Sequence, residues 1–373
     1  MKPIISILLI FYNDDKYIAE TIKSIINQTF KDFELIMLDN GSTDNSYKIA
    51  SEYEKQDSRI KIIRIKQNYH NGSLNFRKLL DYTNGKYIKL FCADDILEPH
   101  CLQTQKELLD SSNYIACFSH MKCINDNSKL IKTNYNSVIK NNRYEYLNHI
   151  FYSHQSFAFP TVMVKKSSIE KSMLDPRLIH FSDVKLWIEL LKKGEVKILD
   201  QYLVKYRIRG NQGNVSNISE NKKKSKSYIF ELHLLYEEFF KIKDFKEFTK
   251  IFPEGHMLTD KLDQKKDKDL LPFITAILLY NSEQFKPFHF SLRRNIALLK
   301  IFDIIKNEKL MSEIEKKLGF TNLSLYKLTS NFCEGIDICY SRQKRNILHK
   351  LWYKLVTRNK YKKLKTQNQI ILT

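Results

Sequence analysis

Four apolar runs, each typical of a β-strand that is buried on both faces, lie within the first hundred residues. They span residues 4–12, 33–38, 60–65 and 87–92. Runs that are apolar throughout, rather than alternating, are typical of a parallel sheet covered by helices. The segments between them have helical spacing, as in Ile18, Ile22 and Ile25. This alternation of strand and helix predicts a doubly wound α/β sheet.

Polar side chains follow each of these four runs. In parallel α/β sheets the ligand binds at the carboxyl ends of the strands. We therefore expect four separate segments to converge on one edge of the sheet. Their polar residues are Tyr12 and Asn13, Asp39 and Asn40, Asn68, and Asp94 and Asp95. We expect two further carboxylates, Asp14 and Asp15, to cap the first helix.

The adjacent carboxylates Asp94 and Asp95 carry the chemistry of this edge. Two like charges repel and are strongly hydrated, so at the end of a buried strand they indicate a site for a cation or for hydroxyl groups. The alternative is that they cap a helix beginning near residue 97. Oxygen ligands favour Mg²⁺ or Mn²⁺, which bridge phosphate oxygens and predict a nucleotide-linked substrate. The chain lacks both common glycine-rich phosphate loops, which disfavours a dinucleotide dehydrogenase or a P-loop ATPase.

Beyond residue 98 the pattern changes gradually from α/β to helical. We expect a helix to residue 109, strands at 114–120, 159–164, 196–199 and 202–208, and a hairpin or loop at 125–142. A helix should follow Asp183, which occupies the cap position, and should end at Gly194. From residue 220 onward the chain is rich in lysine and aromatic residues with helical spacing. We predict a boundary near residue 217, which gives domains 1–217 and 218–373.

The net charge of +20, from 62 Lys and Arg against 42 Asp and Glu, indicates an acidic partner such as nucleic acid, anionic lipid or a phosphorylated substrate. The six cysteines have no C-x-x-C spacing, so we expect reduced thiols in the cytoplasm. The apolar start lacks a small-residue cleavage site and fits a core strand better than a signal peptide. The run at 270–280 is shorter than the roughly 20 residues that a membrane span needs, so we predict no such span.

The segment 342–365 has ten basic and no acidic residues, and Leu348, Leu351, Trp352 and Leu355 can share a helical face. This pattern suits a helix lying on anionic lipid. A solvated basic helix packed on its own domain explains it equally well.

The ordered series of motifs resembles glycosyltransferase family 2. Residues 7–13, 18–25, 28–30, 33–36 and 39–44 resemble its opening segment. Residues 85–89 and 93–95 resemble its Asp-x-Asp region, residues 182–187 its acidic region, and Arg207 onward the segment that closes its catalytic domain. The resemblance covers about residues 4–216. It implies a GT-A fold, a Rossmann-like mixed sheet with flanking helices, here followed by a mostly α-helical domain.

The resemblance also implies a role for each matching residue. Tyr12 would stack on the base of a nucleotide sugar, usually a UDP sugar, and Asp39 and Asn40 would contact base or ribose, with Asn68 beside them. Asp94 would hold ribose or metal, and Asp95 would hold Mn²⁺ or Mg²⁺. Asp183 would be the general base of a single displacement with inversion; the alternative is that it only caps its helix. Arg207 and Arg209 would meet the diphosphate, or would be solvated at the strand edge.

Three positions depart from the family pattern. Cys92 stands where many members have the first Asp of Asp-x-Asp, which leaves the metal to Asp94 and Asp95. Ser182 replaces the acidic residue before the base. Residues 75–78 also differ, so Arg77 and Lys78 receive no role.

We therefore expect an inverting, metal-dependent hexosyl- or N-acetylhexosaminyltransferase that acts on a bacterial surface glycan, such as lipopolysaccharide or capsule, or on its lipid-linked precursor. We expect it in the cytoplasm, peripheral at the inner face of the membrane. One alternative is a catalytically silent, glycan-binding relative. Another is a nucleic-acid-binding protein, which is disfavoured because no helix-turn-helix, RRM or zinc signature is present.

Overall fold

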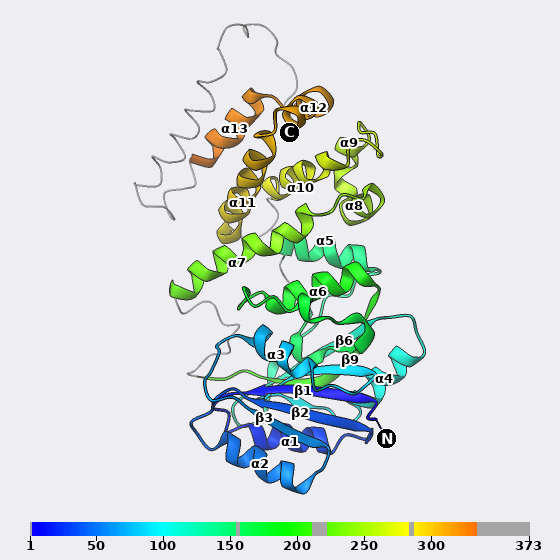
Figure 1. The fold of residues 1–373 in the computed structure, drawn as a ribbon, viewed down its shortest axis with the longest axis vertical. Coiled ribbons are helices and arrows are strands. Elements are labelled where there is room, and N and C mark those ends of the chain that lie inside the picture. Colours follow the sequence, from blue (N-terminus) through cyan, green and yellow to red (C-terminus); the bar gives the residue numbers. More distant parts are fainter. Residues whose placement is uncertain (1, 154–156, 211–221, 283–286, 334–373) are drawn as a thin grey trace. The chain divides into compact units, whose positions relative to one another are not determined.

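The computed structural model describes residues 2–153, 157–210, 222–282 and 287–333 (Figure 1). The chain forms two compact units, residues 1–239 and 240–373. The division therefore falls about one helix beyond the boundary predicted near residue 217. The reason is that α7 (Lys222–Phe240) packs on the first unit, where the Tyr236 hydroxyl donates to the Phe151 carbonyl at 3.0 Å.

Within the described residues, the first unit holds one nine-stranded sheet in the order β3-β2-β1-β4-β8-β6-β9-β5, with β7 paired to β6. The strands are β1 (Ile5–Phe11), β2 (Phe33–Asp39), β3 (Ile60–Arg64), β4 (Tyr87–Cys92), β5 (Ile96–Leu97), β6 (Ala116–Ile124), β7 (Leu130–Tyr135), β8 (Met163–Lys165) and β9 (Val196–Arg207).

The strands β3, β2, β1 and β4 run parallel, as their apolar runs predicted. Beyond β4 the sheet is mixed: β8 is antiparallel to both β4 and β6, whereas β6 and β9 are parallel. Burial explains the sequence pattern, because the side chains of β1 are almost all inaccessible to solvent under the helices. Helices cover both faces of the parallel part (Figure 1). Because its four strands are parallel, their carboxyl ends lie at one edge.

The helices of the first unit besides α7 are α1 (Ile18–Ile26), α2 (Ser46–Gln56), α3 (Gly72–Leu80), α4 (Cys101–Asp110), α5 (Arg143–Ser153) and α6 (Ser182–Lys193). No element was predicted over α5. It forms because the Asn142 side chain accepts from the first backbone N–H groups, of Tyr144 and Glu145, and because Leu147 and Phe151 bury one face.

Several predicted boundaries were wrong for identifiable reasons. The segment 159–164 begins as a 3-10 turn, η1 (Phe159–Thr161), because Pro160 has no N–H for a sheet ladder. The two strands predicted at 196–208 are the single strand β9, in which register shifts beside His120 absorb the polar residues 200–201. The expected cap of α1 is also wrong: its N-cap residue is Tyr17, without a side-chain cap.

The second unit is helical throughout its described residues, as predicted for the C-terminal domain. Its helices are α8 (Phe245–Ile251), α9 (His256–Thr259), α10 (Leu271–Tyr280), α11 (Pro287–Ile305), α12 (Glu308–Leu318) and α13 (Asn322–Cys333). Nine of the ten residues of α10 are buried, which makes this helix the centre of the unit. In the part of the chain that the structure describes, no helix is long and apolar enough to cross a membrane. The basic segment 342–365 lies outside the described residues.

Candidate active site

The loops that follow β1 and β2 are joined by hydrogen bonds. Asn13 has a left-handed backbone conformation (φ 54°), its N–H donates to Ser42 Oγ at 3.1 Å, and its side-chain oxygen accepts from the Thr43 N–H at 2.9 Å. Tyr12, beside it, is 39% exposed, and its ring meets the His70 imidazole edge-on with the centroids 6.4 Å apart. The loops therefore hold an accessible aromatic ring at the strand edge.

The ends of β2 and β3 also meet, as predicted. The Asn40 amide donates to Asn68 Oδ1 at 2.7 Å, and Asn40 Oδ1 accepts from the Tyr69 N–H at 3.2 Å. Gly41 (φ +80°) makes this approach possible, because a Cβ at this position would lie 3.0 Å from the Asn68 nitrogen. Asp39 is buried, accepts from the Ser42 N–H at 2.9 Å and lies 3.0 Å from Arg64 Nε.

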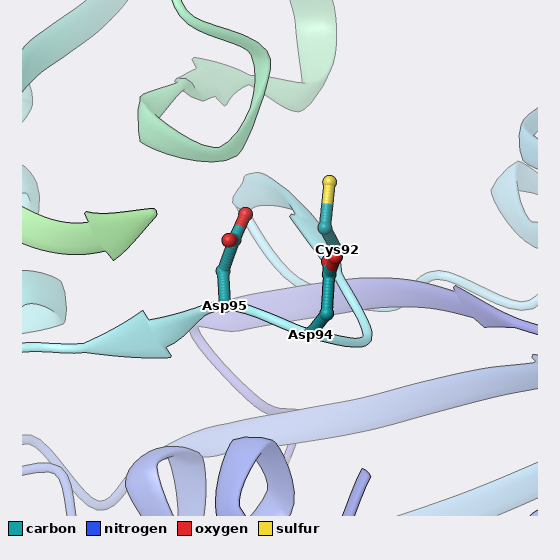
Figure 2. A group of neighbouring side chains, drawn as sticks. All are labelled: Cys92, Asp94 and Asp95. Atoms are coloured by element: carbon teal, nitrogen blue, oxygen red, sulfur yellow. The ribbon is translucent and has the colours of Figure 1, made fainter. Parts of the chain in front are cut away.

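Cys92, Asp94 and Asp95 form a cluster at the end of β4, and their side chains point to the same side of the loop (Figure 2). Their potential ligand atoms all lie within 4.8 Å of one another. Asp95 is fully buried, and its Oδ1 accepts from the Arg207 N–H at 2.8 Å. Asp94 is more accessible, with 17% of its side chain exposed. Burial and the Asp94 charge raise the pKa of Asp95 well above its usual value.

A divalent cation fits the two carboxylates of this cluster better than the thiol. Asp95 Oδ2 is buried and has no hydrogen-bond partner among the described residues, and a bound cation would satisfy that oxygen. Burial, with the neighbouring carboxylates, raises the pKa of the Cys92 thiol well above its usual value, so the thiol stays neutral. A neutral thiol is a poor ligand for Mg²⁺ or Mn²⁺, which prefer oxygen.

Arg207 supports the cluster from β9. Its guanidinium is fully buried, donates to the Asp94 carbonyl at 2.8 Å and pairs with Glu20 at 2.7 Å. Solvation at the strand edge, one of the two predicted alternatives, is therefore wrong for Arg207.

Arg209 lies between two carboxylates. Its Nε donates to Asp94 Oδ2 at 2.6 Å, and its Nη2 pairs with Asp14 Oδ1 at 2.5 Å. Burial raises the pKa of Asp14, and the Arg209 guanidinium opposes that rise. Asp14 was predicted to cap a helix and is instead part of this site. The available signal was its position just after β1, where the other site residues also follow their strands.

Asp183 is the second residue of α6, where Phe181 is the N-cap residue. The predicted cap position was therefore wrong by two residues. The Asp183 side chain accepts from the adjacent Val184 N–H at 2.8 Å. Burial raises the pKa of Asp183 to about 6. The segment before α6 contacts the strand edge, because the Asn71 amide donates to the Pro176 carbonyl at 2.6 Å.

A cavity of about 240 Å³ opens beside α5. Its lining combines aromatic, aliphatic and polar side chains, from Tyr135, Asn136, Val138, Tyr146, His149, Ile150 and Phe157. His149 Nε2 is buried and has no hydrogen-bond partner among the described residues. Burial raises the pKa of the Tyr135 phenol, and the nearby Asp183 carboxylate adds to this rise. Tyr135 therefore links the cavity to Asp183.

The chain is similar to known glycosyltransferases in sequence and in fold. It is 31% identical over 227 residues to an uncharacterized glycosyltransferase of Methanocaldococcus jannaschii, covering 59% of this chain and 76% of that protein. It is 27% identical over 232 residues to the Escherichia coli UDP-Glc:alpha-D-GlcNAc-diphosphoundecaprenol beta-1,3-glucosyltransferase WfgD, covering 59% and 81%.

Residues 1–349 of S. aureus TarS, crystallised with UDP-GlcNAc, align with a TM-score of 0.53 at 17% identity, covering 80% of this chain and 88% of that one. This likeness confirms the predicted GT-A fold. The family model described as glycosyl transferase family 2 matches residues 6–172. Because both this family model and the Methanocaldococcus jannaschii relative match, the chain belongs to glycosyltransferase family 2.

Proposed function

We propose that this protein is an inverting, metal-dependent glycosyltransferase that moves a hexosyl or N-acetylhexosaminyl group from a UDP sugar to a hydroxyl of a cell-surface glycan or of its lipid-linked precursor. The observation that carries the proposal is the carboxylate pair Asp94 and Asp95 at an edge where four strand ends converge, combined with a separate carboxylate of raised pKa, Asp183.

The strand edge suits a nucleotide donor. The exposed Tyr12 ring offers a stacking surface for the base, and the loops that carry Asp39, Asn40 and Asn68 are held in place by their mutual hydrogen bonds. The names of WfgD and of the TarS complex specify UDP sugars, which supports a uridine nucleotide here.

Asp94 and Asp95 would hold the divalent cation. When bound, Mn²⁺ or Mg²⁺ would neutralise the negative charge of the donor diphosphate. Arg209 already places a positive charge against Asp94 and Asp14, so the free protein keeps these two carboxylates compensated. Arg209 is therefore placed to exchange its carboxylate contacts for phosphate contacts when the donor binds.

Asp183 would be the general base for the acceptor hydroxyl. A carboxylate with a pKa of about 6 is ionised at neutral pH yet is a stronger proton acceptor than an ordinary aspartate. Attack by the deprotonated hydroxyl on the anomeric carbon would release UDP and invert that centre in one displacement. The cavity that Tyr135 lines would receive part of the acceptor glycan, with its aromatic rings against a sugar face and its polar groups on the hydroxyls.

A thermal-unfolding screen tests this proposal. UDP and GDP sugars are added singly to the full chain with Mn²⁺ or with EDTA. A ligand that binds only the folded state stabilises it by about 2.7 kcal/mol at 100 times its Kd. We expect a UDP sugar to raise the Tm with Mn²⁺ and to have a much smaller effect with EDTA. The proposal is overturned if no nucleotide sugar raises the Tm under either condition.

A further inference from the structure

The carboxylate of Glu231 on α7 binds the backbone just before α6. Its Oε2 accepts the N–H groups of Ile179, His180 and Phe181 at 2.9, 2.7 and 3.1 Å. Glu231 is only 2% exposed. Three successive N–H groups thus converge on one buried oxygen, two residues before the candidate base Asp183.

We propose that Glu231 is a positioning residue for Asp183, an inference that rests on the proposed role of Asp183 as base. The segment 174–181 that leads into α6 is irregular, so its own backbone does not fix the direction in which α6 starts. Hydrogen bonds to a charged oxygen are shorter and stronger than neutral ones. Glu231 therefore fixes three consecutive peptide groups and, through them, the first turn of α6.

Two further contacts hold the same helices together. The Tyr228 ring packs on Phe181 with the centroids 4.4 Å apart. Farther along α7, Glu238 pairs with Lys185 at 2.8 Å and with Lys192 at 2.7 Å. Both Asp183 and the contacting residues of α7 lie beyond the matched residues 6–172 and within the first unit, so the candidate base and its support come from the same part of the chain.

Glu231 acts through geometry rather than through its charge on Asp183. The raised pKa of Asp183 comes from burial and is opposed by backbone N–H groups, with no contribution from Glu231. A loss of Glu231 should therefore lower kcat without shifting the pH at which activity rises. The donor loops are on other segments, so the donor KM should stay the same.

The test compares two variants of the full chain. Glu231→Leu removes the hydrogen-bond acceptor, whereas Glu231→Gln keeps one side-chain oxygen that can accept. UDP release is measured from UDP-glucose and UDP-N-acetylglucosamine, with water as acceptor. We expect kcat to fall about 10- to 100-fold in Glu231→Leu, in line with the cost of an ångström-scale misplacement, and to recover to within about threefold of the wild type in Glu231→Gln. Phe230→Ala is the matched control on the same helix, because the Phe230 side chain is 65% exposed, and its kcat should be near that of the wild type.

A double-mutant cycle separates positioning from general stabilisation. In an Asp183→Asn background, Glu231→Leu should have no further effect on the residual rate, because the residue that it positions is already inactive. Amide hydrogen exchange of residues 179–181 should become faster in Glu231→Leu and not in Phe230→Ala. If Glu231→Leu does not fold, Glu231→Asp replaces it, with an intermediate loss of kcat because the shorter side chain cannot reach all three N–H groups.

The outcomes distinguish this inference from the proposed function. A wild-type protein whose Tm is raised by no nucleotide sugar would overturn the proposed function, and hydrogen exchange would still report on the Glu231 contacts. The positioning role alone would be overturned if Glu231→Leu had the kcat of the wild type. It would also be overturned if Glu231→Leu lowered the rate by the same factor in the wild-type and in the Asp183→Asn background.

Discussion

Replacement of Asp183 by Asn separates its chemical role from its structural one. The amide has nearly the same volume as the carboxylate. Its oxygen can still accept from the Val184 N–H, which donates to Asp183 Oδ1 at 2.8 Å in the wild type. It cannot take a proton from an acceptor hydroxyl. General-base catalysis typically contributes a factor of about 10² to 10⁴, so we expect kcat to fall by that factor.

The same substitution should stabilise the fold above pH 6. The folded-state pKa of Asp183 is raised from 3.8 to about 6, so its contribution to stability is fully present below pH 3.8 and is lost as the pH rises through about 6. Each pKa unit corresponds to about 1.4 kcal/mol, which gives roughly 3 kcal/mol as an upper limit. Because Asp183 is partly exposed, solvent screening reduces this limit to about 1–2 kcal/mol.

The assay measures UDP release between pH 5 and 8 and thermal unfolding at pH 5 and 8. Wild-type turnover should rise through about pH 6, and at pH 8 the Asn variant should unfold several degrees higher than the wild type, at about 2–4 °C per kcal/mol. Asp57→Asn is the control of opposite sign, because the Arg59 partner lowers the pKa of Asp57. That variant should lose stability at neutral pH and keep its turnover. An Asp183→Asn protein with turnover within threefold of the wild type, or with a lower Tm at pH 8, would refute the reasoning.

Two substitutions test the cation site itself. In Arg209→Gln, Asp14 and Asp94 lose their shared partner, so without metal the variant should be roughly 1–3 kcal/mol less stable than the wild type. Mn²⁺ should then raise the Tm of the variant by more than it raises the Tm of the wild type. An equal rise in both proteins would contradict this. In Cys92→Asp, a hard oxygen ligand replaces a neutral thiol, so half-maximal Mn²⁺ activation should occur at a lower Mn²⁺ concentration; the same or a higher concentration would show that position 92 does not reach the metal.

The parallel half of the fold and the convergence of its strand ends could be predicted from sequence because both are local consequences of chain pattern. Apolar runs identify strands buried on two faces, and the polar residues after them must lie at the same edge. The resemblance to a known family added Asp183 as a candidate base, 88 positions after Asp95, the last residue of that edge in the sequence. The Asn40 and Asn68 contact agrees with this reasoning.

Contacts between distant, irregular segments could not be predicted in this way. Arg209 meets Asp14 across 195 positions, and Glu231 meets residues 179–181 across about 50, and no periodicity connects either pair. The extent of the first unit was missed for a related reason. A change in composition marks residue 220, but buried contacts made by Tyr236 keep α7 in the first unit.

Calorimetric titration of UDP into the full chain, with Mn²⁺ and with EDTA, tests most directly whether Asp94 and Asp95 form a metal-dependent nucleotide site. Asp95→Asn is the informative variant, because an amide can keep the contact with the Arg207 N–H while removing the carboxylate. We predict that UDP binds the wild type with Mn²⁺, and that either EDTA or the substitution weakens binding at least about tenfold, a difference of about 1.4 kcal/mol. Equal UDP affinity with Mn²⁺, with EDTA and in Asp95→Asn would contradict the account.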